Sequence, residues 1–258
     1  MKPRTQQHGV LAYLFLIMVV GCTPPAAKEE APAPSEDGGV RVAAAPLAPS
    51  AEQVVRAYVP NHIALSFDDV VEGKLPEGWK IDATNPRGRL ADWAVVTDAK
   101  APSTPSVLSL TKVNDTFGGV FNLCWNSNVS FEDGEIEAKV RANSGKVDQG
   151  GGMIWRAKDA NNYYIVRYNP LESNFRLYYV KDGARRILAD ASDLSIRAGE
   201  WFTIRIVHKA NKIEGWLNGK KLLEITDRTF RKGGGIGVWT KADAATSFDD
   251  LIVRSENR

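Results

Sequence analysis

The chain of 258 residues is 43% hydrophobic and 25% charged, and its formal net charge is +2. Lys2 and Arg4 account for that charge, so residues 22–258 are neutral overall, and no basic run interrupts them. We therefore expect no nucleic-acid partner. After residue 21 the histidines are His62 and His208, which lie too far apart in sequence to indicate an imidazole-bound metal.

Residues 1–21 have the pattern of a secretory signal peptide. A short basic start precedes an unbroken apolar run of eleven residues, 10–20, which is shorter than the roughly 20 residues that span a bilayer. The run ends in the letters VVGC, which resemble the lipobox of bacterial lipoproteins. An ordinary signal peptide that happens to precede a cysteine is the alternative. The resemblance implies that Cys22 is the lipidated N-terminus, and Thr23 after it implies an outer-membrane location in the cell envelope.

Residues 22–58 have the composition of a disordered tether. From Thr23 to Ala57 the chain is rich in proline and alanine and has no aromatic residue. Such a segment buries too little apolar surface to offset the entropy lost on ordering. All seven tryptophans come after it. We therefore predict one folded domain at residues 59–258, which is long enough for one sizeable core.

The predicted domain consists of short strands. Apolar and polar residues alternate over runs that glycine, asparagine, aspartate and proline separate, and no long amphipathic helix is indicated. Asn218-Gly219 is typical of a two-residue hairpin with a type I′ turn, and Asp182-Gly183 is similar. Cys124 lies in an apolar run and is expected to be a buried, inert thiol. Such a series of strands predicts an all-β sandwich of two antiparallel sheets. The expected strands are 63–67, 94–96, 107–110, 119–125, 134–141, three within 151–180, 186–189, 201–209, 212–217, 220–226, 235–240 and 247–254.

The run 134–141, GEIEAKVR, places carboxylates on one face of a strand. Alternation puts Glu135 and Glu137 on the face opposite Ile136 and Ala138. Two carboxylates about 5–5.5 Å apart are what a retaining glycosidase uses. The alternative is a solvated ladder in which the glutamates pair with Arg156 or Arg167 across strands.

Residues 151–180 predict a meander of three antiparallel strands, each with one strongly apolar face and one face that carries an arginine. The side chains on the polar faces include Arg156, Tyr163, Arg167, Asn174 and Arg176. If the run 134–141 lies beside this meander, its two glutamates join the same surface. Guanidinium groups offer forked donors to sugar oxygens and carboxylates. We therefore favour a ligand-binding surface over ion pairs that only keep the sheet soluble.

Residues 239–243 follow a glycine-rich run and are predicted to form a loop at the rim of a sheet. Trp239 in such a loop offers an aromatic surface for a sugar ring. A tryptophan that caps the core is an equal alternative. Lys241 and Asp243 are candidates for a polar clamp or an acid–base pair.

Four segments, taken in order, resemble the 3-keto-disaccharide hydrolase domain family. They are GEIEAKVR, GGMIWRAKDANNYYIVRYNP, GEWFTIRIVHKANKIEGWLNGK and GGGIGVWTKADAATSFDDLIV. The resemblance covers about residues 65–253. It implies a concanavalin A-like, laminin-G-like jelly roll, distantly related to glycoside hydrolase family 16. That family uses the pattern E-x-D-x-x-E. Here Glu137 replaces the aspartate and Val140 the last acid, so its retaining mechanism is not expected.

The resemblance implies an activity on glycosides that are oxidised at C3. The ketone acidifies the hydrogen at C2, so a base removes it, the C1 substituent leaves, and water then adds. Glu135, Glu137 and Asp243 are the candidates for the base and the acid. Two alternatives remain: a non-catalytic, lectin-like module that binds glycans, and a protein-interaction domain of the cell envelope.

The resemblance also bears on cofactors. In such jelly rolls the first and last strands lie side by side, and many relatives bind a structural Ca²⁺ there through oxygen ligands. Asp68 and Asp250 belong to Asp-Asp pairs at the two ends of the domain and are the candidate ligands. Turn-forming aspartates are the alternative. No other cofactor is expected.

Overall fold

The structure is a computed structural model that describes residues 61–256. The signal peptide, the lipidated Cys22 and the tether lie outside these residues and stay predictions. The described part of the chain consists of β-strands and their connections, and it includes no helix long and apolar enough to span a membrane. The strands are β1 (Asn61–Leu65), β2 (Trp79–Thr84), β3 (Asp92–Thr97), β4 (Ser106–Lys112), β5 (Phe121–Phe131), β6 (Gly134–Ser144), β7 (Gly151–Asp159), β8 (Asn162–Asn169), β9 (Asn174–Lys181), β10 (Ala184–Ala191), β11 (Trp201–Lys209), β12 (Lys212–Leu217), β13 (Lys220–Thr226), β14 (Gly234–Lys241) and β15 (Ala245–Ser255).

Eight strands form the first sheet, in the order β13-β12-β11-β6-β15-β4-β3, with β1 paired to β15. Strand β6 shows how the sequence builds it. Ile136, Ala138 and Val140 are buried, while the charged residues between them are only half-buried. Strict alternation of apolar and charged residues gives a strand one face for the core and one for water. The first sheet therefore has one dry face and one charged outer face.

Seven strands form the second sheet, in the order β10-β9-β8-β7-β14-β5-β2. Strand β8 is buried on both faces, from Tyr163 to Asn169. Its Tyr164 and Val166 pack toward the first sheet, whereas Tyr163 and Ile165 belong to a second apolar cluster. We call this second set the outer cluster, because it lies on the outer face of the second sheet. Its members are Phe121, Leu123, Trp125, Ile154, Ala157, Ala160, Tyr163, Ile165, Tyr178, Val180 and Trp239.

Aromatic rings dominate the core between the sheets. Trp155 stacks on Tyr164 with ring centroids 5.5 Å apart, and Tyr168 meets Phe202 edge-on at 5.2 Å. Burial of each such ring contributes about 1.5–3 kcal/mol. The indole nitrogen of Trp155 donates to Nδ1 of His208 at 2.9 Å, and burial lowers the pKa of His208 to about 3. The imidazole is therefore neutral and belongs to the core.

Most of the predicted architecture is confirmed. The expected strands each overlap a strand of the structure, and the two sheets make an antiparallel sandwich. Asn218 and Gly219 both have positive φ, 48° and 77°, as a type I′ turn requires. Strand β2 was not predicted, although its sequence, WKIDAT, alternates between apolar and polar residues.

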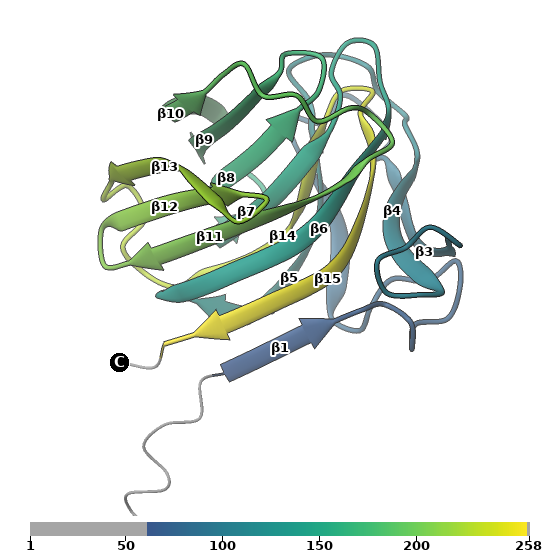
Figure 1. The fold of residues 1–258 in the computed structure, drawn as a ribbon, viewed down its shortest axis with the longest axis horizontal. Coiled ribbons are helices and arrows are strands. Elements are labelled where there is room, and N and C mark those ends of the chain that lie inside the picture. Colours follow the sequence, from purple (N-terminus) through teal and green to yellow (C-terminus); the bar gives the residue numbers. More distant parts are fainter. Residues whose placement is uncertain (1–60, 257–258) are drawn as a thin grey trace, which may run out of the picture. The chain divides into compact units, whose positions relative to one another are not determined.

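The two ends of the described chain lie together. Strand β1 runs antiparallel to β15, from Asn61 opposite Ser255 to Leu65 opposite Leu251, and Figure 1 shows them side by side.

Cys124 is free and fully buried, and burial raises the pKa of its thiol. The expected inert thiol is confirmed.

Candidate functional site

The outer face of the second sheet gathers most of the polar residues predicted from the meander. Tyr163 and Arg167 on β8 share this face with Tyr178 on β9, as the pairing of Ile165 with Tyr178 requires. The predicted alternation is therefore confirmed for both strands. All three side chains are at least 96% buried, which distinguishes this face from an ordinary solvated sheet surface.

Arg167 is fixed on this face by its neighbours and keeps one donor free. Nη1 donates to Asn174 Oδ1 at 2.5 Å, and Nη2 donates to Glu172 Oε2 at 2.8 Å and to Tyr178 Oη at 3.1 Å. Its Nε is buried and has no hydrogen-bond partner within residues 61–256. These three hydrogen bonds fix the orientation of the Arg167 guanidinium, and its Nε–H is available to donate to a ligand.

Glu172 couples Arg167 to Arg176. Arg176 donates from Nη1 to Glu172 Oε2 and from Nε to Asp190 Oδ1, both at 2.9 Å. Burial alone would raise the pKa of Glu172. Hydrogen bonds from Arg167 and Asn174 and the charges of the two arginines outweigh it and lower the pKa to about 2. Arg176 is engaged by carboxylates, so it contributes less to a ligand site than Arg167.

Arg185 on β10 belongs to the same face. Its Cζ lies 4.5 Å from the ring centroid of Tyr178, 5.1 Å from that of Phe121 and 5.8 Å from that of Trp239. Its Nη1 is buried, and no residue of the described chain accepts a hydrogen bond from it. Burial lowers the pKa of Arg185. Three aromatic faces thus hold this cation where a carboxylate would ordinarily do so.

Lys241 and Asp148 form a sheltered ion pair on the same face. Lys241 Nζ lies 2.6 Å from Asp148 Oδ2, and the two side chains are 15% and 3% exposed. Asn169 Nδ2 donates to the other carboxylate oxygen of Asp148 at 3.0 Å. Lys241 faces Phe121 across the β14–β5 pairing, and Phe121 contacts Arg185. The ion pair therefore borders the arginines.

Asp243 positions the loop that carries Asp148. Its carboxylate accepts backbone N–H bonds from Lys146 at 2.7 Å, Val147 at 3.0 Å and Asp148 at 2.9 Å. Burial alone would raise the pKa of Asp243, but these bonds lower it. A carboxylate so engaged is a weak proton acceptor. The sequence had suggested a pair of Lys241 and Asp243. In the structure Lys241 pairs with Asp148 instead.

Gly152 leaves the centre of this face without a side chain. It is paired with Arg167 on β8 and with Trp239 on β14. A Cβ atom at Gly152 would lie 1.8 Å from the backbone oxygen of Val166, so only glycine fits where these strands meet. The arginine and the aromatic residue therefore flank a bare backbone segment.

The glutamates of β6 lie on the other side of the sandwich. Strand β6 pairs with β11 and β15 in the first sheet, so the expected convergence of Glu135 and Glu137 with the meander is wrong. Glu135 accepts from Arg254 Nη1 at 2.5 Å and lies 3.6 Å from Arg205 Nη1. Glu137 faces Arg205 in the β6–β11 register. A ladder of charges is therefore present, as the alternative expected, but its arginines are Arg254 and Arg205 and not Arg156 or Arg167.

Arg156 also leaves the predicted surface. The β7–β8 register shifts after Trp155, and Arg156 has a φ of 46°, so a bulge turns its side chain away from the face of Ile154. Its acceptors, 2.6–3.2 Å away, are the backbone oxygens of Glu132, Ala210 and Phe230 and the carboxylate of Asp133. Arg156 ties three connections together, and we assign it a structural role.

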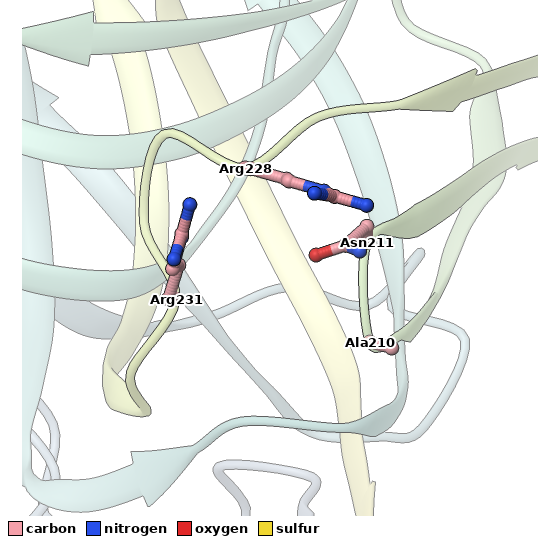
Figure 2. A pocket seen from close by; sticks show the side chains of 4 residues that line it. All are labelled: Ala210, Asn211, Arg228 and Arg231. Atoms are coloured by element: carbon pink, nitrogen blue, oxygen red, sulfur yellow. The ribbon is translucent and has the colours of Figure 1, made fainter. Parts of the chain in front are cut away.

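A pocket of about 390 Å³ opens beside the loops that Arg156 holds. Ala210 and Asn211 line it from the β11–β12 turn, and Arg228 and Arg231 line it from the loop before β14, with Arg228 extending toward Asn211 (Figure 2). Both arginines are exposed. Because these loops adjoin Arg156 rather than Gly152, the pocket is separate from the outer-face residues described above.

Trp239 lies in a strand and not in the predicted rim loop. It is part of β14 and 1% exposed. Its ring packs against Phe121 with centroids 5.3 Å apart, and its Nε1 donates to Tyr163 Oη at 3.2 Å. Trp239 continues the glycine-rich strand β14, and its side chain is part of the outer cluster. Arg185 lies over the Trp239 ring.

The aspartates predicted to bind calcium lie close to buried Asp249. Asp68 Oδ1 accepts from the Ser106 N–H at 2.9 Å, and Asp250 Oδ1 accepts from the Ser103 hydroxyl at 2.5 Å. Burial, reinforced by the charges of Asp250 and Asp68, raises the pKa of Asp249 to about 6. No group of three His, Cys, Asp or Glu residues within 61–256 is arranged to hold a metal. Calcium stays a prediction.

Sequence reasoning missed Arg185 and Asp148. Arg185 lies on an edge strand with little apolar alternation, and Asp148 lies in the β6–β7 loop, where periodicity gives no signal. One signal was present for Arg185. It follows the Asp182-Gly183 turn, whose hairpin register places it opposite Val180, a residue of the outer cluster.

Three solved structures share this architecture. They are the carbohydrate binding module CBM66 from Bacillus subtilis (17% identity, 69% of this chain and 96% of that one, TM-score 0.54), the cellulose induced protein Cip1 (15%, 75% and 97%, 0.55) and the beta-glucanase of Bacillus licheniformis (10%, 76% and 98%, 0.52). At these identities the likeness shows the fold alone, a jelly roll of two antiparallel sheets.

Sequence comparison defines the family. No curated protein matches the chain. Residues 66–254, which include β2 to β14 and nearly all of β15, match the model of a domain described as 3-keto-alpha-glucoside-1,2-lyase-like. This carbohydrate-related family is the one that the sequence motifs resembled. Because the match spans most of the chain, the protein belongs to the family of 3-keto-alpha-glucoside-1,2-lyase-like domains.

Proposed function

We propose that this protein is a lyase that cleaves the glycosidic bond of 3-keto-glycosides at the outer face of the second sheet. The observation that carries the proposal is the sheltered Lys241–Asp148 pair, which lies beside arginine donors that have no acceptor in the described part of the chain. Family membership supplies the reaction class, and this face supplies the groups that such a reaction needs.

The elimination needs a proton acceptor next to a proton donor. The Asp148 carboxylate takes the proton from C2, and the electron pair of the C–H bond passes to the C3 oxygen as an enolate. When the enolate collapses, the C1–C2 double bond forms and the C1–O bond breaks. The Lys241 ammonium then protonates the leaving oxygen. Later addition of water to the double bond gives net hydrolysis.

The surroundings of the pair suit this exchange. The proton gained by Asp148 can return to Lys241 across their 2.6 Å contact, which restores both groups. Asn169 orients one carboxylate oxygen, and Asp243 fixes the loop on which Asp148 lies. A sheltered site also strengthens every electrostatic interaction within it. This chain's own residues thus account for both proton transfers.

A non-catalytic, lectin-like glycan-binding module is the second candidate. The observation that favours it is the burial of Asp148, which is only 3% exposed at its side chain. In that case the arginines and the outer cluster would bind a saccharide without turnover. The two candidates share a location, so they differ in chemistry and not in which residues contact the sugar.

Turnover decides between the two candidates. We expect wild-type protein to release the aglycone from 3-keto-α-glucosides and not from the parent glucosides. Asp148→Asn should lower that rate by about 10²–10⁴-fold, because it removes the base. Glu137→Gln, on the opposite face, is the matched control and should keep the rate. If wild-type protein cleaves no keto-glycoside while calorimetry shows saccharide binding, the lectin-like candidate replaces the lyase.

Location at the cell envelope is a separate proposal. It is supported by the residue pattern before Cys22 and by the tether composition of residues 22–58. We expect mass spectrometry of the mature protein to find acyl chains on Cys22, and Cys22→Ser to shift the protein from the membrane fraction to the soluble fraction. Recovery of unmodified wild-type protein in the soluble fraction would contradict the proposal.

A further inference from the structure

Two arginines share one aromatic ring on the outer face of the second sheet. The Cζ atoms of Arg185 and Arg167 lie 4.5 Å and 5.8 Å from the ring centroid of Tyr178. We propose that these two guanidinium groups hold the C3 oxygen of the sugar, first as the ketone and then as the enolate. This inference rests on the proposed lyase function and adds the groups that stabilise its charged intermediate.

The free donors point to an oxygen ligand. Arg167 Nε and Arg185 Nη1 are both buried and lack an acceptor within residues 61–256. Buried polar atoms nearly always have a partner, and an unsatisfied N–H of a cation is especially costly. Two such atoms on neighbouring side chains indicate one ligand group that accepts from both. A carbonyl oxygen, with two lone pairs, is such a group.

The charges point to an oxygen that becomes negative. Arg167 lies close enough for its charge to disfavour the charged form of Arg185. The rings of Tyr178, Phe121 and Trp239 stabilise the Arg185 cation, yet they offer it no hydrogen-bond acceptor. An enolate oxygen between the two guanidinium groups relieves their repulsion and satisfies both donors. Once Arg185 has turned toward the sugar, two such donors stabilise the charge as it develops.

The other arginines of the meander do not fit this role. Arg176 directs its Nε and Nη1 to Asp190 and Glu172, and Arg156 directs its donors to loop acceptors away from this face. Arg185 also lies near Lys241, because Phe121 contacts Arg185 and is the register partner of Lys241. The C2 hydrogen and the C3 oxygen of a sugar are on adjacent carbons. The base and the enolate site must therefore be neighbours, as they are here.

Binding requires the Arg185 side chain to move. Its Nη1 is shielded from solvent, and its guanidinium covers Phe121 and Trp239. Arg185 lies on β10, an edge strand of the sheet, which among the described strands pairs with β9 alone. Rotation away from the rings would expose aromatic surface for the sugar and turn the freed donor toward its C3 oxygen. In the free protein Arg185 thus covers the aromatic rings, and in the complex it donates a hydrogen bond to the sugar.

Proton exchange at C2 tests this role directly. The probe is the 3-keto derivative of 1,5-anhydroglucitol, which has no exocyclic leaving group at C1, so enolate formation appears in D₂O as loss of the C2 proton signal by NMR. We expect Arg185→Ala to slow this exchange about 10²–10³-fold, as loss of an oxyanion donor does. Arg185→Lys keeps the charge but loses the fork, and we expect at least a tenfold loss.

Arg186→Ala is the matched control. It removes the same charge from the next residue of β10, which is exposed and faces Tyr179 in the hairpin register. We expect its exchange rate to stay within about twofold of wild type. Thermal unfolding checks that each variant is folded, and Arg185→Lys carries the test if Arg185→Ala is not.

The outcomes separate the inference from the proposed function. An unchanged or faster exchange in Arg185→Ala would overturn the inference and make Arg185 a mere cover, while the lyase function stands. If wild-type protein neither exchanges the C2 proton nor cleaves a keto-glycoside, the proposed function fails, and the role of Arg185 fails with it. Selective loss of exchange at C2, with Arg186→Ala unaffected, supports the inference.

Discussion

The outer faces of the two sheets carry similar residues in opposite states. On the first sheet Lys212, Lys221, Glu214 and Glu224 form an alternating ladder with N–O distances of 2.5–3.4 Å, and most of these side chains are well exposed. On the second sheet the outer cluster is buried, and Arg167 and Arg185 retain donors that have no acceptor within residues 61–256. A row of charges therefore does not define a site. Burial and unsatisfied donors do.

The difference has a thermodynamic basis. Exposed ion pairs contribute little, because water competes for both partners and long side chains lose entropy when they are held. A buried cation lowers stability unless its N–H groups have hydrogen-bond acceptors. A buried arginine therefore indicates either a structural role or a ligand site. We therefore expect burial, rather than charge, to determine how much a charged residue contributes to the stability and activity of this protein.

The largest effect is expected for Arg156→Ala. Arg156 is 3% exposed and makes an ion pair with Asp133 besides its bonds to three backbone oxygens. Breaking a buried pair typically costs about 3–5 kcal/mol, and chemical denaturation would measure it. Arg254→Ala is the control, because its partner Glu135 lies on the exposed ladder, and it should cost under about 1 kcal/mol. Equal losses in both variants would contradict the role of burial.

Asp249→Asn should change how stability depends on pH. Asp249 has a pKa of about 6 in the folded protein against an ordinary 3.8, so the folded state holds its proton longer and wild-type stability falls as pH rises from about 4 to 6. The fall is at most about 3 kcal/mol. Asparagine does not titrate, so unfolding free energies of variant and wild type should draw together, or cross, from pH 4 to pH 7. A difference that is constant with pH would contradict this.

Calcium gives the same residue a second test. An ion bound by the predicted ligands Asp68 and Asp250 would favour the charged form of the neighbouring Asp249 and remove the fall in wild-type stability above pH 4. Unfolding measured with calcium and with a chelator should therefore diverge most at neutral pH if the predicted site exists. Identical curves would leave these aspartates as hydrogen-bond acceptors for Ser103 and Ser106.

The sequence predicted one level of this molecule well and another poorly. Alternation assigned Tyr163 and Arg167 to one face of β8 and Tyr164 to the other, because the two-residue period is a local property of the chain. Sheet membership is not local. Nothing in GEIEAKVR states that β6 pairs with β11 and β15, so Glu137 was expected on the wrong side. The sheltered position of Asp148 likewise depends on contacts with residues distant in sequence, Asn169 and Lys241.

Glu172→Gln should have a moderate, pH-dependent effect. The pKa of Glu172 is lowered to about 2 in the folded protein from 4.5, so its contribution is present above about pH 4.5 and is lost as pH falls toward 2. Because the side chain is 42% exposed, we expect only about 1 kcal/mol at pH 7. Unfolding at pH 7 and at pH 2 would measure it. A loss of the same size at both values would show that the carboxylate charge is not responsible.

The smallest effect is expected where the sequence placed catalysis. Glu135→Gln and Glu137→Gln alter half-buried side chains on the charged outer face of the first sheet. Each should change the free energy of unfolding by under about 0.5 kcal/mol and leave keto-glycoside turnover within about twofold of wild type. A large loss of turnover in Glu137→Gln, with the fold intact and Asp148→Asn active, would move the site to the first sheet. It would also mean that a half-buried carboxylate of the first sheet outweighs the sheltered Asp148, which reverses the comparison between the two faces.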